Sequence, residues 1–150
     1  MEILHNPVLV AAVMGWFVAQ VLKTIIHLIV TKQFVLERMV GSGGMPSSHA
    51  ATVCALATAA GLEFGGGSFE FAVAVILAII VMHDARGVRR ETGIQARILN
   101  EMMETFRKMG NKMTAEERLK EFVGHTPLQV LVGALLGILI GAVTWWLMNQ

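Results

Sequence analysis

Four apolar runs, separated by short polar stretches, make up most of the chain. A helix needs about 20 mainly apolar residues to cross the hydrocarbon core of a bilayer. The second run is shorter and rich in Ala, which suits tight packing against other helices. The pattern therefore predicts an all-α, polytopic membrane protein with four transmembrane helices, at about residues 7–30, 47–62, 69–83 and 127–148.

Composition supports a membrane location. Of the 150 residues, 55% are hydrophobic and 15% are charged, and the mean hydropathy is +0.62. A soluble domain is usually about 45–50% apolar and about 25% charged. The length fits a single membrane-embedded domain, residues 1–150. The net charge of +1 gives no reason to expect nucleic acid as a partner, and the single Cys54 excludes an internal disulfide.

The basic residues are sorted to one side of the predicted helices. All 12 Lys and Arg lie in residues 23–38 and 86–120, whereas residues 1–6 and 61–70 carry acidic residues and neither Lys nor Arg. Loops rich in Lys and Arg stay in the cytoplasm. We therefore expect an integral membrane protein, in the plasma membrane if the cell is bacterial, with both termini outside and the 84–125 segment in the cytoplasm.

The long cytoplasmic segment has a pattern of its own. Ile94, Ile98, Met102 and Phe106 recur at helical spacing, and the charged residues between them fall largely on other faces. Such a pattern is typical of a helix that lies at the membrane interface or over the ends of other helices. An amphipathic helical segment is therefore predicted within residues 84–125.

Two of the predicted helices begin with a histidine on the cytoplasmic side. His49 follows Ser47 at the start of the second helix, and His125 precedes Thr126 at the start of the fourth. Ser47 and Thr126 are favourable N-caps. The N–H groups and the dipole at a helix start favour anions such as phosphate. The same field opposes protonation of a nearby imidazole, which keeps one ring nitrogen available as a nucleophile or base.

Other ionisable residues are predicted to reach the same end of the helices. Lys23 and His27 lie one turn apart near the end of the first helix, and the third helix ends at Asp84 and Arg86. Phosphoryl transfer uses cations and N–H groups to hold the phosphoryl oxygens, one His to attack phosphorus and another to protonate the leaving oxygen. Each residue also has a structural interpretation: Ser47 as a helix cap, the arginines as cytoplasmic anchors, and Lys23 as a snorkelling side chain. The histidine spacing does not match a zinc site, so no metal and no cofactor is expected.

Three segments together resemble the divergent branch of the type 2 phosphatidic acid phosphatase (PAP2) superfamily, which is described as related to acid phosphatases and vanadium-dependent haloperoxidases. The segments are residues 42–49, 84–90 and 124–127, the last with the Gly-rich helix that follows it. In the superfamily, a Pro-Ser-Gly-His motif holds phosphate through its Ser and backbone amides, and its His is the general acid. Residues 46–49 are similar, with Ser48 in the Gly place.

The resemblance also assigns roles around the second histidine. His125 matches the superfamily's nucleophile, but Gln129 stands where the superfamily has the Asp that orients it. An amide can accept a hydrogen bond from an imidazole N–H but carries no charge, so Asp84 is the hypothesised substitute. The predicted catalytic residues are thus His125, His49 and Asp84, and the predicted phosphate ligands are Ser47, Ser48, Lys23, Arg38, Arg86 and Arg89.

Three hypotheses for function follow. The leading one is a metal-independent phosphatase that acts on a phospholipid or polyprenyl phosphate or pyrophosphate at the cytoplasmic face, through a phosphohistidine at His125. The second is a non-catalytic lipid-phosphate binding or transport protein that uses the same site. The third is a structural subunit, because Gly133, Gly137 and Gly141 form a close-packing stripe that predicts either a homodimer or packing within one bundle.

Overall fold

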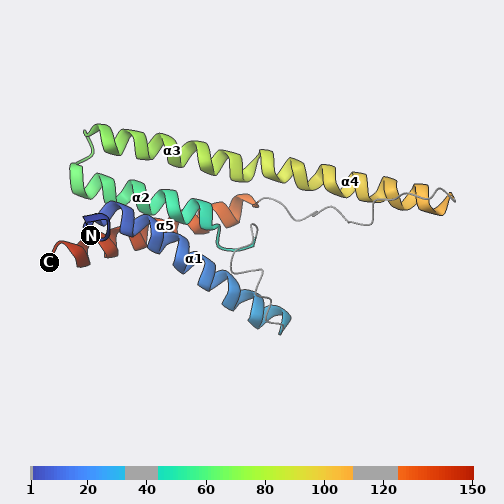
Figure 1. Cartoon of the computed structure of the whole chain (residues 1–150), viewed down its shortest axis with the longest axis horizontal. Helices are drawn as coiled ribbons and strands as arrows, with labels where there is room; N and C mark the ends of the chain where they lie inside the picture. The colour runs from blue at the N-terminus through green and yellow to red at the C-terminus, as the bar shows by residue number, and fades with distance from the viewer. Residues whose placement is uncertain (1, 33–43, 110–124) are drawn as a thin grey trace.

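The computed structural model describes residues 2–32, 44–109 and 125–150, and every regular element among them is helical. Figure 1 shows a bundle of helices beneath a long helical rod, with both chain termini at the same end of the bundle. The elements are a short 3-10 helix, η1 (Glu2–His5), followed by α1 (Pro7–Thr31), α2 (Ser48–Phe64), α3 (Phe69–Arg86), α4 (Val88–Lys108) and α5 (Pro127–Met148). The predicted all-α class is confirmed.

Helix α2 forms the centre of the bundle. It packs most extensively against α5 and also contacts α1 and α3. Its alanines account for this position, because small side chains let neighbouring backbones approach closely. Ala50, Ala51, Ala55 and Ala59 are fully buried. The Ala-rich run is thus the least lipid-exposed of the apolar runs, as its composition predicted.

The glycine stripe of α5 packs against α2. Gly133, Gly137 and Gly141 are all buried, and a Cβ added at Gly141 would lie 2.7 Å from the carbonyl oxygen of Ala55. The backbones of the two helices therefore lie so close together that no residue larger than glycine fits at these positions. Of the two arrangements predicted for this stripe, packing within one bundle is the one observed. A homodimer through these glycines would require α5 to leave α2.

Three helical stretches of the described chain are long and apolar enough to cross a bilayer: Pro7–Thr31, Phe69–Phe106 and Pro127–Met148. Helix α2 is not among them, since it has 17 residues. At about 1.5 Å per residue it is about 25 Å long, slightly less than the hydrocarbon thickness of about 30 Å. The described chain thus has three membrane-capable helices, and the fourth predicted span falls on this short central helix.

Helices α3 and α4 follow one another almost without interruption. Gly87 donates its N–H to the carbonyl oxygen of His83 and accepts from the N–H of Glu91, so helical hydrogen bonding continues through the junction. The rod formed by the two helices extends well beyond the bundle (Figure 1). The segment predicted to be an amphipathic helix is therefore helical, and the helix begins earlier than its apolar pattern suggested. Ile94, Ile98, Met102 and Phe106 are all exposed on it.

Candidate active site

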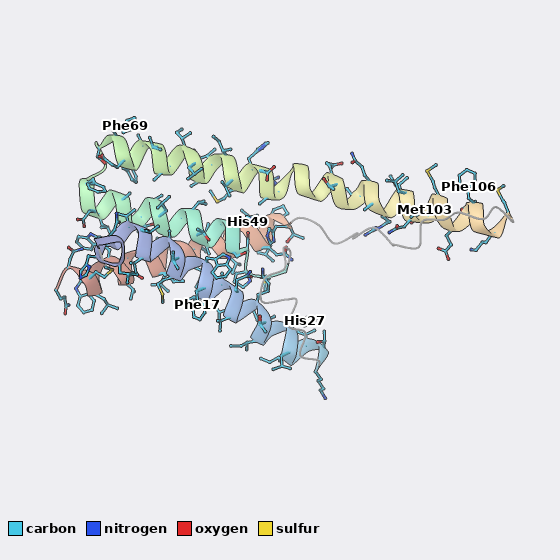
Figure 2. All side chains as sticks on the ribbon, viewed as in Figure 1. Phe17, His27, His49, Phe69, Met103 and Phe106 are labelled. Atoms are coloured by element: carbon cyan, nitrogen blue, oxygen red, sulfur yellow. The ribbon has the colours of Figure 1, made fainter. Side chains whose placement is uncertain are left out.

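The starts of α2 and α5 meet at one end of the bundle and are held there by backbone hydrogen bonds. The N–H of Ser47, just before α2, donates to the carbonyl oxygen of Gln129 in the first turn of α5, over 3.1 Å. The N–H of His125 donates to the carbonyl oxygen of Ala85 near the end of α3, over 3.0 Å. Segments far apart in the sequence are thereby fixed around the two histidines. Figure 2 shows His49 at this end of α2, next to the start of α5.

The two histidine rings are neighbours. Their centroids are 5.7 Å apart and their planes make an angle of 66°. His125 is only 2% exposed, and its Nε2 atom is buried without a hydrogen-bond partner in the part of the chain that the structure describes. A buried polar atom without a partner costs about 1–3 kcal/mol in most proteins. Such an atom is therefore a strong indication of a site that receives a ligand.

The opposite nitrogen of the same ring is engaged. Nδ1 of His125 lies 3.3 Å from Oε1 of Gln129. That oxygen also accepts the N–H of Thr126 over 3.0 Å, while the Thr126 hydroxyl accepts the N–H of Gln129 over 3.3 Å. This is a capping box, in which the predicted cap Thr126 and the third helical residue satisfy each other's N–H groups. One glutamine thus both starts α5 and contacts the imidazole.

A buried lysine lies on the α1 side of the site. Lys23 is 3% exposed, and its Nζ donates to Oε1 of Gln20, one turn earlier, over 2.6 Å. The loop before α2 covers its aliphatic part: Gly44 has a φ of +87°, which favours glycine, and a Cβ there would lie 3.3 Å from Cγ of Lys23. Gln20 was not predicted as part of the site. The signal was a polar residue three positions before Lys23 in an apolar run.

The surroundings of His125 disfavour its protonated form. Burial lowers the pKa of this ring, which stands before α5 and outside its apolar span, and the charges of His49 and Lys23 lower it further. The hydrogen bond to Gln129 acts in the opposite direction. Burial normally lowers the pKa of an imidazole, because it disfavours the charged form. The ring therefore stays neutral at a lower pH than the ordinary pKa of about 6.5 would allow.

This pKa shift predicts a loss of stability in acid. A group whose pKa is lower in the folded than in the unfolded chain binds more protons when unfolded. Its contribution is therefore intact above a pH of about 6.5 and lost as the pH falls toward the folded-state pKa. We expect the melting temperature of the wild type in detergent to fall more steeply below this pH than that of His125→Gln, which cannot titrate. Parallel curves for the two proteins would show that His125 is not held neutral.

Sequence comparison adds an independent observation. The model of the divergent PAP2 family matches residues 4–140. The chain belongs to the divergent PAP2 family. A relative in Bacillus subtilis (strain 168), the uncharacterized membrane protein YuiD, is 40% identical in an alignment 149 residues long that covers 93% of this chain and 94% of the relative. No solved structure matches the chain.

The predicted site residues of this divergent PAP2 protein occupy different surroundings. Ser47 is fully buried and caps α2, its hydroxyl accepting the N–H of Ala50 over 3.4 Å. Ser48 is also buried, Asp84 is half-buried near the end of α3, and Arg86 is exposed. The structure thus gathers His49, His125, Ser47, Ser48 and Lys23 at one end of the bundle. Arg38 and the side chain of Arg89 lie outside the described part of the chain.

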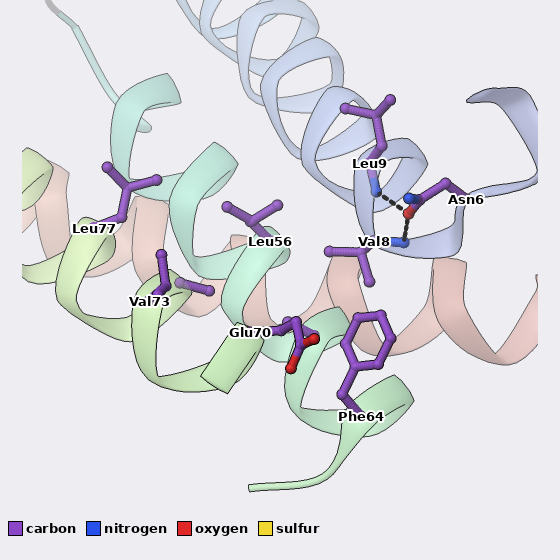
Figure 3. A pocket seen from close by; sticks show the side chains of 10 residues that line it. Asn6, Val8, Leu9, Leu56, Phe64, Glu70, Val73 and Leu77 are labelled. Carbon is purple, nitrogen blue, oxygen red and sulfur yellow. Dashed lines mark hydrogen bonds between the residues drawn. The ribbon is translucent and has the colours of Figure 1, made fainter. Parts of the chain in front are cut away.

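A cavity of about 380 Å³ lies at the other end of the divergent PAP2 bundle, between α1, α2 and α3. Figure 3 shows its wall of apolar side chains, including Leu9, Leu56 and Leu77, with Glu70 beside it. None of its lining residues is a Lys, Arg or His. A phosphate group needs cations or N–H donors, so this cavity is not suited to the phosphate chemistry expected near His125.

Proposed function

We propose that this protein is a membrane phosphatase that hydrolyses a lipid phosphate or pyrophosphate through a phosphohistidine at His125. The supporting observation is the buried Nε2 atom of His125, which lacks a hydrogen-bond partner among the described residues and stands beside a second imidazole. A neutral imidazole nitrogen that makes no other hydrogen bond is a suitable nucleophile for phosphorus. Membership of the divergent PAP2 family supports the same class of reaction.

The proposed reaction has two steps. The lone pair on Nε2 of His125 attacks phosphorus, the bond from phosphorus to the leaving oxygen breaks, and His49 gives that oxygen a proton. Water then attacks the phosphohistidine, His49 takes its proton, and phosphate leaves as the electron pair returns to Nε2. With ring centroids 5.7 Å apart the two imidazoles are in edge contact, so a reacting group that binds against one ring lies close to the other.

Lys23 and the start of α2 are the proposed phosphate-binding groups. The charge of Lys23 already acts on His125, so it lies within electrostatic reach of a phosphoryl group there. The first N–H groups of a helix lack intrahelical acceptors and favour anions. The start of α2 suits this role better than that of α5, where the capping box already uses the N–H groups of Thr126 and Gln129. Asp84, Arg38, Arg86 and Arg89 stay candidates from the sequence.

The side of the membrane is part of the proposal. The sorting of Lys and Arg favours a catalytic end in the cytoplasm and both termini outside. Helix α2 would then be a short fourth span, shielded from lipid by α1, α3 and α5. A short span of this kind is tolerated because its backbone hydrogen bonds are internal and its ends are capped.

Phosphate release by the purified protein tests the function. The substrates are phosphatidic acid, phosphatidylglycerol phosphate, and polyprenyl mono- and pyrophosphates, each with and without vanadate. We expect release from at least one substrate, inhibition by vanadate, and at least about tenfold weaker kcat/KM in Lys23→Met. Short-chain substrate added to sealed membrane vesicles should be cleaved faster with inside-out than with right-side-out vesicles. No release from the whole panel would refute the proposal.

One observation favours a second candidate, a non-catalytic lipid-phosphate binding or transport protein. The Nδ1 atom of His125 pairs with the uncharged amide oxygen of Gln129, which stabilises an imidazolium less than a carboxylate would. Saturable binding of a lipid phosphate that depends on Lys23, without release of phosphate, would favour this candidate over the enzyme.

A further inference from the structure

The capping glutamine of α5 determines which nitrogen of His125 carries the proton. A backbone N–H can only donate, so the Gln129 atom that faces the N–H of Thr126 is the carbonyl oxygen, Oε1. The same oxygen lies 3.3 Å from Nδ1 of His125. An oxygen acceptor pairs with Nδ1 only when Nδ1 carries the hydrogen. In a neutral ring the lone pair then sits on Nε2.

The two ring nitrogens of His125 therefore differ in their hydrogen bonding. Nδ1 is held by an amide that is itself fixed by the start of α5, whereas Nε2 is buried and makes no hydrogen bond within the described structure. Gln129 is anchored further because its carbonyl oxygen accepts the N–H of Ser47. The ring of His125, which is in edge contact with that of His49, is thus held with Nε2 unengaged, and a neutral residue provides this orientation.

The lack of charge on Gln129 has a chemical consequence. When Nε2 bonds to phosphorus, the ring becomes positive. A hydrogen bond to an imidazolium is stronger when the acceptor carries a negative charge than when it is a neutral amide. A carboxylate at this position would therefore stabilise the developing charge more than the amide does. When the positive charge on the attacking histidine is less stabilised, the reaction rate depends more strongly on how easily the leaving group departs.

From this geometry we propose that Gln129 is a positioning residue that fixes the Nδ1–H form of His125, and that its neutrality makes the site selective for lipid diphosphates over lipid monophosphates. The selectivity rests on the proposed phosphatase function; the proton position does not. In a diphosphate the leaving group is a lipid monophosphate, whose last pKa is about 6, so it departs as a stable anion. In a monophosphate the leaving group is an alcohol, which must receive a proton from His49.

The reaction with a diphosphate balances without a further reactant. The Nε2 lone pair forms the bond to the terminal phosphorus, and the bond from that phosphorus to the bridging oxygen breaks, its electron pair leaving with the lipid monophosphate. Nδ1 keeps its hydrogen and its contact with Gln129. Water then displaces the imidazole from phosphorus, which gives inorganic phosphate, a proton and neutral His125.

The first experiment compares farnesyl diphosphate with farnesyl monophosphate, which share the same lipid chain. We expect kcat/KM of the wild type to be at least about 100-fold higher for the diphosphate, the lower end of what general-acid assistance contributes. Gln129→Glu keeps the length of the side chain and adds a negative charge. We expect faster monophosphate turnover, so that the ratio of the two kcat/KM values falls at least about tenfold. Thr126→Ala, which weakens the cap and leaves Gln129 in place, should lower the melting temperature and keep the preference.

The second experiment does not require activity. Nitrogen-15 and carbon-13 NMR of histidine-labelled protein, with His125 assigned by comparison with His125→Gln, reports which ring nitrogen carries hydrogen. We expect the Nδ1–H form in the wild type and a shift toward the Nε2–H form in Gln129→Leu. An Nε2–H form in the wild type, or a shift caused by Asp84→Asn and not by Gln129→Leu, would overturn the role of Gln129 whatever the enzyme does.

The outcomes separate this inference from the proposed function. The selectivity would be overturned if the monophosphate were hydrolysed as fast as the diphosphate or faster, or if Gln129→Glu kept the preference of the wild type. In either case the protein would still be a phosphatase. Absence of turnover with either substrate would overturn the phosphatase and the selectivity together. The NMR result would then still decide whether Gln129 fixes the proton on Nδ1.

Discussion

Replacement of His125 with alanine is expected to reduce phosphate release by at least about 10⁴-fold, because the substitution removes the nucleophile itself. His49→Ala should cost about 10²–10⁴-fold on a lipid monophosphate, where it must protonate an alcohol, and less on a diphosphate. The measurement is single-turnover hydrolysis of substrate labelled in its terminal phosphate. Acid quenching destroys a phosphohistidine, so the protein-bound label is sought after alkaline denaturation.

Two controls make this result specific. His27→Ala removes a half-buried histidine from the part of α1 that diverges from the bundle (Figure 2), so its turnover should match that of the wild type. His125→Gln fills a similar volume without a basic ring nitrogen. It therefore distinguishes the loss of the nucleophile from the effect of the cavity that alanine would leave. Retention of turnover in both His125 variants would exclude His125 as the nucleophile, and label bound to His49 would reverse the two roles.

The largest expected effect on stability is that of Gly137→Leu. An added Cβ at Gly137 would meet the backbone of Ala51, with its Cα at 2.9 Å and its carbonyl carbon at 3.0 Å. Backbone atoms in the middle of a packed helix cannot move aside without separating α2 from α5. Overpacking usually costs about 1–3 kcal/mol, and a whole leucine in this contact should exceed that range. We expect little folded protein after extraction, measured by size-exclusion chromatography and thermal unfolding in detergent.

Ala72→Leu is the matched control for this prediction. It adds a similar amount of side chain on α3, but at an exposed position where lipid can accommodate it. Its yield and melting temperature should stay close to those of the wild type. Gly137→Ala should lie between the two, because it adds only the Cβ. Normal folding of Gly137→Leu would show that α5 does not pack on α2 through its glycines.

Local patterns in the sequence predicted the helices and their starts. Apolar runs place the spans, and the caps at Ser47 and Thr126 depend on residues no more than three positions away. The boundary between the third helix and the cytoplasmic helix was less well predicted. Hydrogen bonding continues through Gly87, so the change from apolar to amphipathic sequence does not interrupt the helix.

The residues of the candidate site could be named from the sequence, but the hydrogen bonds between them could not. His49, His125, Ser47 and Lys23 could be named from their residue types and from their places at the ends of apolar runs. The pairing of Lys23 with Gln20 was missed, because spacing alone does not tell which face of α1 is buried. The sequence also directed attention to Asp84 as the partner of His125, whereas in the described structure Nδ1 of His125 pairs with the amide oxygen of Gln129. The role of Asp84 stays a prediction.

The sequence by itself therefore determined a helical membrane protein and the positions of its helices, and it supplied the candidate residues for the proposed phosphate chemistry. These depend on hydrophobicity and on contacts within one or two turns. The tertiary structure decided that α2 is central, that the glycines of α5 face α2, and that the rings of His49 and His125 lie 5.7 Å apart. Those features depend on how separate helices pack, and close packing is set by the shapes of facing surfaces, which no single segment specifies.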